Sequence, residues 1–244
     1  MAITVMKRYE LKYLLSAHQA EYLRRALEGK MLVDAFGRTS IASLYYDTPD
    51  RRLVRASMEK PEFKEKLRLR SYGPATEASP VFLELKRKYD GVVYKRRVQT
   101  TIPQAEGFLA GTEGMGDGQI GRELAYFRDY YRTLEPACLI IYDRTAYFQP
   151  EGDLRLTVDD LPRYRTEDLS LTKGMEGIPL LGEGQSILEV KVQQAMPLWL
   201  SAILSEGGIR KGSFSKYGEA YRRQLTGEDA GYAAPALPRL PGAA

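Results

Sequence analysis

The sequence contains very few of the side chains that most often carry out catalysis. There is one cysteine, Cys138, and one histidine, His18. A single cysteine excludes an internal disulfide and a cysteine-rich zinc site. A single histidine excludes every multi-histidine metal centre and leaves no spare histidine beside a His-based triad. The chemistry of this chain therefore falls mainly to Lys, Arg, Asp, Glu and hydroxyl groups.

Long apolar segments are also absent. The longest strongly apolar run, Ala137–Tyr142, is far shorter than the roughly 20 residues of a membrane-spanning helix, and the N-terminus has no signal-peptide core. We therefore expect no membrane span and a cytoplasmic location. The net charge of +4 is too small to indicate nucleic-acid binding, so no nucleic-acid partner is expected.

The sequence has no complete glycine-rich phosphate-binding motif. Gly116, Gly118 and Gly121 have G-x-G-x-x-G spacing, but no strand leads into them and no βαβ unit of ~30 residues surrounds them. The segment Gly207–Ser213 lacks the Gly-Lys pair that ends a Walker A loop. Any phosphate binding must therefore use another kind of site.

What the sequence does contain is a series of strands. Period-2 alternation or short apolar runs predict strands over Arg8–Leu14, Ser40–Asp47, Lys64–Ser71, Val81–Tyr89, Val92–Thr101, Leu139–Phe148, Leu154–Asp159 and Ser186–Gln193. Asp90-Gly91 is a strong hairpin signal. Helical periodicity predicts helices over Ser16–Gly29, Gly121–Leu134 and Pro197–Glu206. We predict an α+β fold, an antiparallel sheet or barrel with helices added, as one domain over residues 1–226 and a flexible tail over residues 227–244.

One face of these strands is basic. Residues two apart share a face of a strand, and with Asp90-Gly91 as the turn Lys86 lies opposite Lys95 while Glu84 lies opposite Arg97. Like charges directly opposite each other are unfavourable. The charged faces carry thirteen cations, Arg8, Lys12, Lys64, Lys66, Arg68, Arg70, Lys86, Lys88, Lys95, Arg97, Arg144, Arg155 and Lys191, against four anions, Glu10, Glu84, Asp159 and Glu189.

Two interpretations fit this segregation of charge. The sheet has a solvated side that is basic, or the charged faces converge on a channel whose cations are neutralised by a polyanion with metal ions. Arginine forks and lysine point charges both suit phosphate. The pattern alone leaves the two interpretations open.

The same residues resemble a known family. In order along residues 8–223, the segments are Arg8-Tyr9-Glu10-Leu11-Lys12-Tyr13, Ser43-Leu44-Tyr45-Tyr46-Asp47, Lys66-Leu67-Arg68-Leu69-Arg70-Ser71-Tyr72-Gly73, Leu83-Glu84-Leu85-Lys86, Tyr142-Asp143-Arg144-Thr145-Ala146-Tyr147, Leu154-Arg155-Leu156-Thr157-Val158-Asp159, Leu188-Glu189-Val190-Lys191 and Ser213-Phe214-Ser215-Lys216-Tyr217. Together they resemble the vacuolar transporter chaperone (VTC) domain. That domain is the catalytic core of eukaryotic polyphosphate polymerase and belongs to the triphosphate tunnel metalloenzyme (CYTH-like) superfamily.

The resemblance implies an antiparallel β-barrel of about eight strands, with helices packed outside and a basic tunnel inside. It implies that phosphate is held by Lys12, Arg68, Arg70, Lys86, Lys95, Arg144, Arg155 and Lys216, with hydroxyl contacts from Tyr142 and Ser215. The charged faces add Arg97 and Lys191 as phosphate-binding candidates. Glu189 matches the glutamate that binds Mn²⁺ or Mg²⁺, and Glu10 and Asp159 are further candidates. The expected catalytic residues are Lys12, Arg68, Arg70, Lys86, Arg144, Arg155 and Glu189.

The activity that the resemblance implies is transfer of the γ-phosphoryl group of ATP to polyphosphate. Hydrolytic tunnel enzymes usually begin with E-x-E-x-K, whereas this chain reads Arg8-Tyr9-Glu10-Leu11-Lys12, with a cation in place of the first carboxylate. The exchange removes a metal ligand and adds a phosphate contact, which favours a polymerase. A triphosphatase of the same fold and a non-catalytic polyphosphate-binding module are the alternatives.

Overall fold

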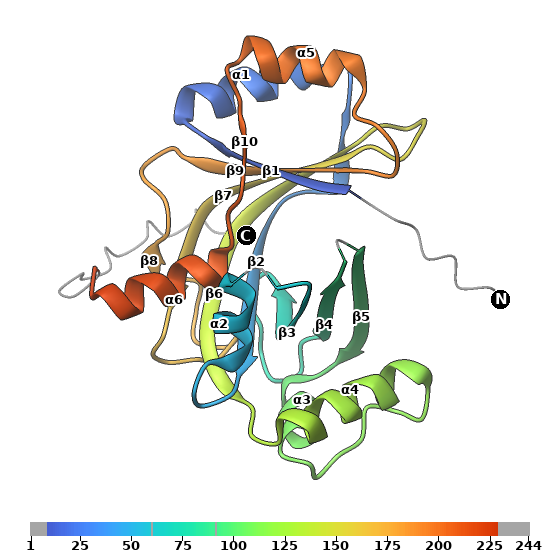
Figure 1. Ribbon diagram of the computed structural model, residues 1–244, viewed down its shortest axis with the longest axis vertical. Coiled ribbons are helices and arrows are strands. Elements are labelled where there is room, and N and C mark those ends of the chain that lie inside the picture. Colours follow the sequence, from blue (N-terminus) through green and yellow to red (C-terminus); the bar gives the residue numbers. More distant parts are fainter. Residues whose placement is uncertain (1–8, 60, 91, 229–244) are drawn as a thin grey trace, which may run out of the picture.

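The computed structural model describes residues 9–59, 61–90 and 92–228 (Figure 1). Its strands are β1 (Tyr9–Leu15), β2 (Leu32–Asp47), β3 (Phe63–Tyr72), β4 (Val81–Tyr89), β5 (Val92–Thr100), β6 (Glu135–Phe148), β7 (Arg155–Arg165), β8 (Ile178–Pro179), β9 (Ser186–Val192) and β10 (Lys211–Gly212). Its helices are α1 (Ala17–Leu27), α2 (Arg52–Met58), α3 (Ile102–Leu109), α4 (Gln119–Tyr131), α5 (Leu198–Glu206) and α6 (Lys216–Thr226). Arg8, Gly91 and residues 229–244 of the predicted tail lie outside the described residues.

The strands form one antiparallel sheet in the order β10-β1-β9-β7-β6-β2-β3-β4-β5, with β8 paired to β7. The long strands β2 and β6 bend through the molecule and connect the part that holds β1 and β9 with the part that holds β3, β4 and β5 (Figure 1). Within the described ranges no pairing joins β10 to β5. The predicted α+β class and antiparallel sheet are confirmed, and the sheet curves like a barrel that stays open along one side.

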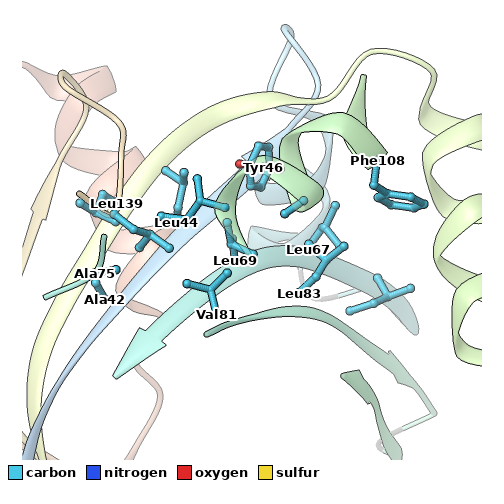
Figure 2. Close-up of a cluster of buried hydrophobic side chains, with 14 of the residues drawn as sticks. Ala42, Leu44, Tyr46, Leu67, Leu69, Ala75, Val81, Leu83, Phe108 and Leu139 are labelled. Atoms are coloured by element: carbon cyan, nitrogen blue, oxygen red, sulfur yellow. The ribbon is translucent and has the colours of Figure 1, made fainter. Parts of the chain in front are cut away.

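Four helices cover the apolar outer faces of the sheet. α3 and α4 pack on β3 and β4 in a cluster that includes Leu67, Leu83 and Phe108 (Figure 2). α1 and α5 pack on β1, β7 and β9 in a second cluster that includes Leu23 and Leu200. Full burial of one such Leu or Phe side chain contributes about 1.5–3 kcal/mol, so these clusters hold the strands in their register.

The helices α2 and α6 pack on the opposite face of the sheet. Tyr45 on β2 lies directly across from Arg68 on β3, so both side chains are on the charged face. The ring of Tyr217 on α6 stacks on Tyr45, with centroids 4.7 Å apart, and Val54 of α2 belongs to the same buried cluster. The two helices therefore close part of the concave side of the sheet.

The sequence patterns predict most strands but not every element. They do not predict α2, α3, α6 or the short β8 and β10. They start β2 at Ser40, whereas this strand begins at Leu32, and they end β7 at Asp159, whereas it runs to Arg165. In the described part of the chain, no helix is long and apolar enough to cross a membrane.

Candidate functional site

Strand register gathers the charged side chains on the concave face. Lys86 lies opposite Lys95 and Glu84 opposite Arg97, as predicted from the hairpin turn. Across the next pair of strands, Lys66 lies opposite Lys86. The residues between them, such as Leu83 and Leu85, are fully buried on the other face. Three lysines therefore form a row across β3, β4 and β5, which we call the lysine row (Lys66, Lys86 and Lys95).

Four cations surround Glu84, whose side chain is 1% exposed. Its carboxylate lies 2.6 Å from Lys95, 2.7 Å from Arg68, 3.5 Å from Arg97 and 3.7 Å from Arg70. Burial acts to raise the pKa of Glu84, but Arg68, Arg70 and Lys95 outweigh it and lower the pKa to about 2. Glu84 is therefore ionised at neutral pH, and it holds together a group that keeps a net positive charge.

A second group of carboxylates comes from β7 and β9. Asp159 is fully buried and accepts hydrogen bonds from Nε and Nη2 of Arg144, at 2.6 and 2.8 Å, and one from Lys216. Glu189 lies within ion-pair distance of Lys12 (3.2 Å), Lys191 (3.6 Å) and Arg144 (3.7 Å). Burial acts to raise the pKa of both carboxyl groups, but Lys12 and Lys216 hold the pKa of Glu189 well below its usual range. Lys216 and Arg144 likewise lower the pKa of Asp159.

One ion pair spans the open side of the sheet. Lys86 on β4 lies 3.3 Å from Glu10 on β1, and Glu10 also lies 3.7 Å from Lys12. Strands β1 and β4 are far apart in the order of the sheet. This contact therefore shows that the two halves of the charged face meet.

Two tyrosines lie between the cations. The hydroxyl of Tyr142 accepts a hydrogen bond from Arg70 at 3.2 Å, and the Arg144 guanidinium lies 5.1 Å from the centre of its ring. The hydroxyl of Tyr45 accepts one from Arg68 at 3.0 Å. Burial acts to raise the pKa of Tyr45, but Arg68 and Arg70 outweigh it and lower the pKa. The phenol oxygens are therefore held in a strongly positive environment.

The N-terminus of α6 brings two more predicted residues into this face. The Ser215 hydroxyl caps the helix by accepting a hydrogen bond from the backbone N–H of Gly218 at 3.1 Å. The same oxygen accepts one from Nζ of Lys66, also at 3.1 Å. Nζ of Lys216 lies 4.4 Å from the centre of the Tyr142 ring. The helix end thus contacts strands from both halves of the sheet.

The comparison with protein families identifies this arrangement. A family model of the VTC domain matches residues 7–224. The chain belongs to the VTC domain family. No curated protein matches it.

Solved structures share the fold of this VTC domain. An adenylate cyclase-like protein of Vibrio parahaemolyticus matches at TM-score 0.52 and 16% identity, over 88% of this chain and 98% of its own. One from Bacillus halodurans matches at TM-score 0.54 and 14% identity, over 86% and 96%. These two proteins therefore share the fold of this chain. A Hippeastrum adenylyl cyclase-like protein, described as having a dominant triphosphatase activity, matches at TM-score 0.49 and 20% identity, over 91% of this chain and 96% of its own.

Within the VTC domain, one predicted site residue stands apart. Arg155 is on the charged face, directly opposite Lys191. Its guanidinium donates to the backbone carbonyls of Leu154 at 3.1 Å and Gln149 at 3.4 Å, and lies 5.4 Å from the Phe148 ring. Among the described residues no carboxylate is within ion-pair distance of it. The other predicted site residues all take part in the connected contacts described above.

The carboxylates of the tunnel fit part of a divalent-metal site. The described residues contain no group of three or more His, Cys, Asp or Glu side chains that could hold a metal ion alone. Glu10 and Asp159 are each close enough to Glu189 for their negative charges to interact, as the upward effect of Glu189 on the pKa of both shows. Mg²⁺ and related hard cations are commonly bound by one or two carboxylates, with phosphate oxygens and water completing the shell. The carboxylates present fit that mode of binding.

Three residues of the site were not among the predicted ligands. Glu84 and Lys66 belong to the charged faces read from the sequence, but nothing in the pattern distinguishes them as a central carboxylate and a contact of α6. Tyr45 lies in a segment that carries the family resemblance, and its pairing with Arg68 and the hydrogen bond that it accepts from Arg68 place it on the charged face. The period-2 alternation of the strands thus predicts which residues lie on the charged face. The contacts between residues from distant strands depend on the curvature of the sheet.

Proposed function

We propose that this VTC domain is a metal-dependent polyphosphate polymerase that transfers the γ-phosphoryl group of ATP to a polyphosphate chain and releases ADP. The proposal takes residues 1–226 as one catalytic domain and residues 227–244 as a tail outside it. It takes ATP and polyphosphate as the partners and Mn²⁺ or Mg²⁺ as the cofactor. A cytoplasmic location goes with the proposal because ATP is the donor.

The observation that supports it is the excess of cations in one connected site. Ten cations take part in the contacts described above, Lys12, Lys66, Arg68, Arg70, Lys86, Lys95, Arg97, Arg144, Lys191 and Lys216, against the four carboxylates Glu10, Glu84, Asp159 and Glu189. Desolvated charge without compensation is costly. A linear polyanion with many oxygens along its length would compensate this excess better than a single phosphate group.

The carboxylates of the tunnel favour phosphoryl transfer over hydrolysis. A general base should have a pKa near the working pH, whereas the pKa values of Glu189 and Asp159 are both lowered by neighbouring cations. Such groups take a proton from water poorly. A phosphate acceptor is already an anion at neutral pH, so transfer to the polymer end does not need a carboxylate base.

The proposed catalysis consists of positioning and charge stabilisation. Arg68, Arg70 and Arg144 would bind non-bridging phosphate oxygens, and Tyr142 would contribute a hydroxyl contact. The bond between the γ-phosphorus and the β,γ-bridging oxygen breaks, a bond from a terminal polyphosphate oxygen to that phosphorus forms, and ADP leaves. Glu189, with Glu10 or Asp159, would hold the divalent ion, which when bound supplies further charge neutralisation.

The test is an assay of products from ATP. The purified protein is incubated with ATP and Mn²⁺, polyphosphate is resolved on a gel, and ADP and orthophosphate are quantified. We expect chain growth, with one ADP released for each phosphate incorporated. Release of orthophosphate without chain growth would show a triphosphatase instead, and binding of polyphosphate without turnover would show a binding module.

A matched pair of variants connects the activity to the site. Glu189→Gln should lose metal-dependent turnover by on the order of 100-fold or more, because a metal ligand is removed, yet it should still bind inorganic triphosphate. Asp143→Asn changes a carboxylate on the outer face of β6, where Asp143 accepts a hydrogen bond from Ser40 at 2.8 Å, and should retain turnover. Unchanged metal dependence in Glu189→Gln would place the metal elsewhere.

A further inference from the structure

A cleft of about 810 Å³ lies between α2, the start of β3 and α4, and none of the residues that line it takes part in the tunnel contacts described above. We call it the tyrosine cleft, and its apolar and aromatic lining consists of Leu53, Ala56, Phe63, Tyr126, Tyr130 and Tyr131. Three of these side chains are well exposed, Phe63 at 49%, Tyr130 at 52% and Tyr126 at 68%. Single exposed apolar groups need no explanation, whereas several gathered at one hollow mark an interaction site.

The rings in this cleft are held in fixed positions. Tyr126 and Tyr130 lie one turn apart on α4, with ring planes 21° apart and centroids separated by 6.3 Å. Tyr130 meets Tyr131 edge to face at 4.9 Å, and the Arg52 guanidinium of α2 lies 5.4 and 5.3 Å from the centres of these two rings. The Tyr131 hydroxyl donates to the buried carboxylate of Glu65 at 3.0 Å. Aromatic walls that are already ordered reduce the entropy lost when a ligand binds.

The charged side chains near these rings already have partners. Arg87 lies 2.5 Å from Glu65 and 3.1 Å from Glu123. Arg122 donates a hydrogen bond to the backbone carbonyl of Asp117. A phosphate ligand would have to compete with these contacts, whereas a segment of mostly apolar residues would not. The cleft therefore offers a ligand chiefly the faces and edges of its aromatic rings, with tyrosine hydroxyls beside them.

The same chain contains a segment with the chemistry that such a cleft binds. Residues 233–242 read Ala-Ala-Pro-Ala-Leu-Pro-Arg-Leu-Pro-Gly, with prolines at positions 235, 238 and 241, and they lie outside the described residues. Nowhere else in the sequence are two prolines three residues apart. Prolines at this spacing fall on one side of a polyproline II helix, which has three residues per turn. Aromatic-lined grooves bind such segments because little entropy is lost in ordering them.

The chain is long enough to connect α6 to the cleft. A Cβ atom at Gly218, in the first turn of α6, would lie 3.7 Å from the side chain of Met58, the last residue of α2. Helix α6 rises about 14 Å from Gly218 to its end at Gly227, whereas the seven residues 228–234 can extend over roughly 23 Å. These residues can therefore bring position 235 back to α2, which forms one wall of the cleft.

We propose that residues 235–241 dock as a polyproline II segment into the tyrosine cleft of the same molecule. The proline rings pack against Phe63, Tyr126 and Tyr130, and the Tyr126 hydroxyl donates to a backbone carbonyl of the segment. The tether gives an effective concentration on the order of 1 mM, so an intrinsic Kd of about 0.1 mM leaves the segment docked for about 90% of the time. The inference is independent of the proposed function, because no tunnel residue takes part in it.

The test is cleavage of the full-length protein by trypsin, because Arg239 lies inside the segment and is followed by Leu240. Cleavage there removes residues 240–244, and mass spectrometry of the intact protein gives its rate. The reference is the same bond in a synthetic peptide of residues 231–244. We expect cleavage roughly 10-fold slower in the protein than in the peptide, as docking for about 90% of the time requires. Equal rates in the protein and the peptide would overturn the proposal.

A matched pair of aromatic variants assigns the protection to the cleft. Tyr126→Ala removes an exposed side chain, so the melting temperature should stay unchanged while the rate at Arg239 approaches that of the peptide. Phe36→Ala removes an 81% exposed aromatic side chain of β2 outside the cleft, and cleavage should stay slow. Slow cleavage that persists in Tyr126→Ala would show that the segment binds elsewhere. Slow cleavage that is lost on dilution would show that it binds a second copy, and either result overturns the proposal.

Discussion

Asp159 is the most deeply placed charge of the tunnel. Its side chain is 0% exposed and is neutralised by two hydrogen bonds from Arg144 and one from Lys216. The excess of cations on the charged strand faces predicts that removing Arg144 relieves repulsion between cations and leaves the fold intact. The contacts reverse this expectation, because Arg144 compensates a carboxylate whose desolvation is costly.

We predict that Arg144→Ala weakens triphosphate binding and also lowers the free energy of unfolding by about 1–3 kcal/mol, the cost of leaving a buried charged group short of hydrogen bonds. Calorimetry and denaturant unfolding measure the two effects. The triple variant Arg144→Leu, Asp159→Leu and Lys216→Met is the control, since replacing all three partners by apolar groups should restore stability but not binding. An Arg144→Ala protein as stable as the wild type would contradict this account.

Helix α6 is positioned by a buried carboxylate at the end of β2. Asp47 is fully buried and accepts hydrogen bonds from the backbone N–H groups of Leu53 (2.8 Å) and Val54 (3.0 Å) at the start of α2. It also accepts one from the Tyr217 hydroxyl at 2.8 Å. Asp47 therefore ties α2 and α6 to the sheet, and through α6 it sets the position of Ser215 and Lys216.

Tyr217→Phe should keep the stacking on Tyr45 but remove the bond to Asp47. We expect the free energy of unfolding to fall by about 1 kcal/mol and triphosphate affinity to fall several-fold, since the N-terminus of α6 is held less firmly. Thermal unfolding and calorimetric titration test both effects. Tyr221→Phe, on the next turn of the same helix, is the matched control. A Tyr217→Phe protein that loses stability but binds triphosphate normally would show that the hydroxyl does not position the site.

The elements that could be predicted from sequence are those whose pattern is local. Strands β3 and β4 alternate charged and buried residues over most of their length, and the predicted bounds of β3, β4 and β5 agree with the structure within one residue. The start of β2 could not be predicted, because residues 32–39 are largely exposed and carry no apolar alternation. The N-cap residue of α2, Arg51, provides no side-chain cap, and the Asp47 carboxylate accepts hydrogen bonds from the first turn of the helix instead.

The contacts of the candidate site also divide into those that a local sequence pattern predicts and those that it does not. Period-2 alternation and the hairpin turn placed Glu84 opposite Arg97 and Lys86 opposite Lys95, which the register confirms. Ser215 and Lys216 came only from the family resemblance, because α6 has no pattern that points it at the tunnel. No strand period could indicate that Lys86 meets Glu10, since that contact depends on how far the whole sheet curves.

At the scale of the whole molecule, the tunnel makes stability depend on pH. The pKa of Lys66 is lowered to about 7 and that of Lys95 to about 8, in both cases chiefly by burial, whereas an unfolded lysine titrates near 10.4. Between about pH 7 and 10 the unfolded chain therefore binds more protons than the folded one. Linkage then requires the free energy of unfolding to rise with pH over this range.

We therefore expect the ligand-free protein to become more stable from pH 7 to pH 8, by at most about 1.4 kcal/mol for each proton involved. Above this range the buried thiol of Cys138 acts in the opposite direction, because burial raises its pKa. Denaturant unfolding at each pH is the measurement. Lys66→Met should reduce the rise, and saturating triphosphate should reverse it, since the bound anion favours protonated lysines. A stability that is flat between pH 7 and pH 8 would contradict this.

The open side of the sheet has a consequence for how a polymer gets in. In the described residues the two sides of the opening meet through side chains, the Lys86–Glu10 pair among them, and not through a ladder of backbone hydrogen bonds. Separating a partly exposed ion pair costs only about 0–1 kcal/mol. Under the proposed function, a long phosphate polymer would then be laid into the tunnel from the side at any point along its length, instead of being threaded from one end. Such a polymer has two ends and many internal phosphate units. If any unit can enter the tunnel, the rate of productive encounter rises with the number of units and not with the number of ends.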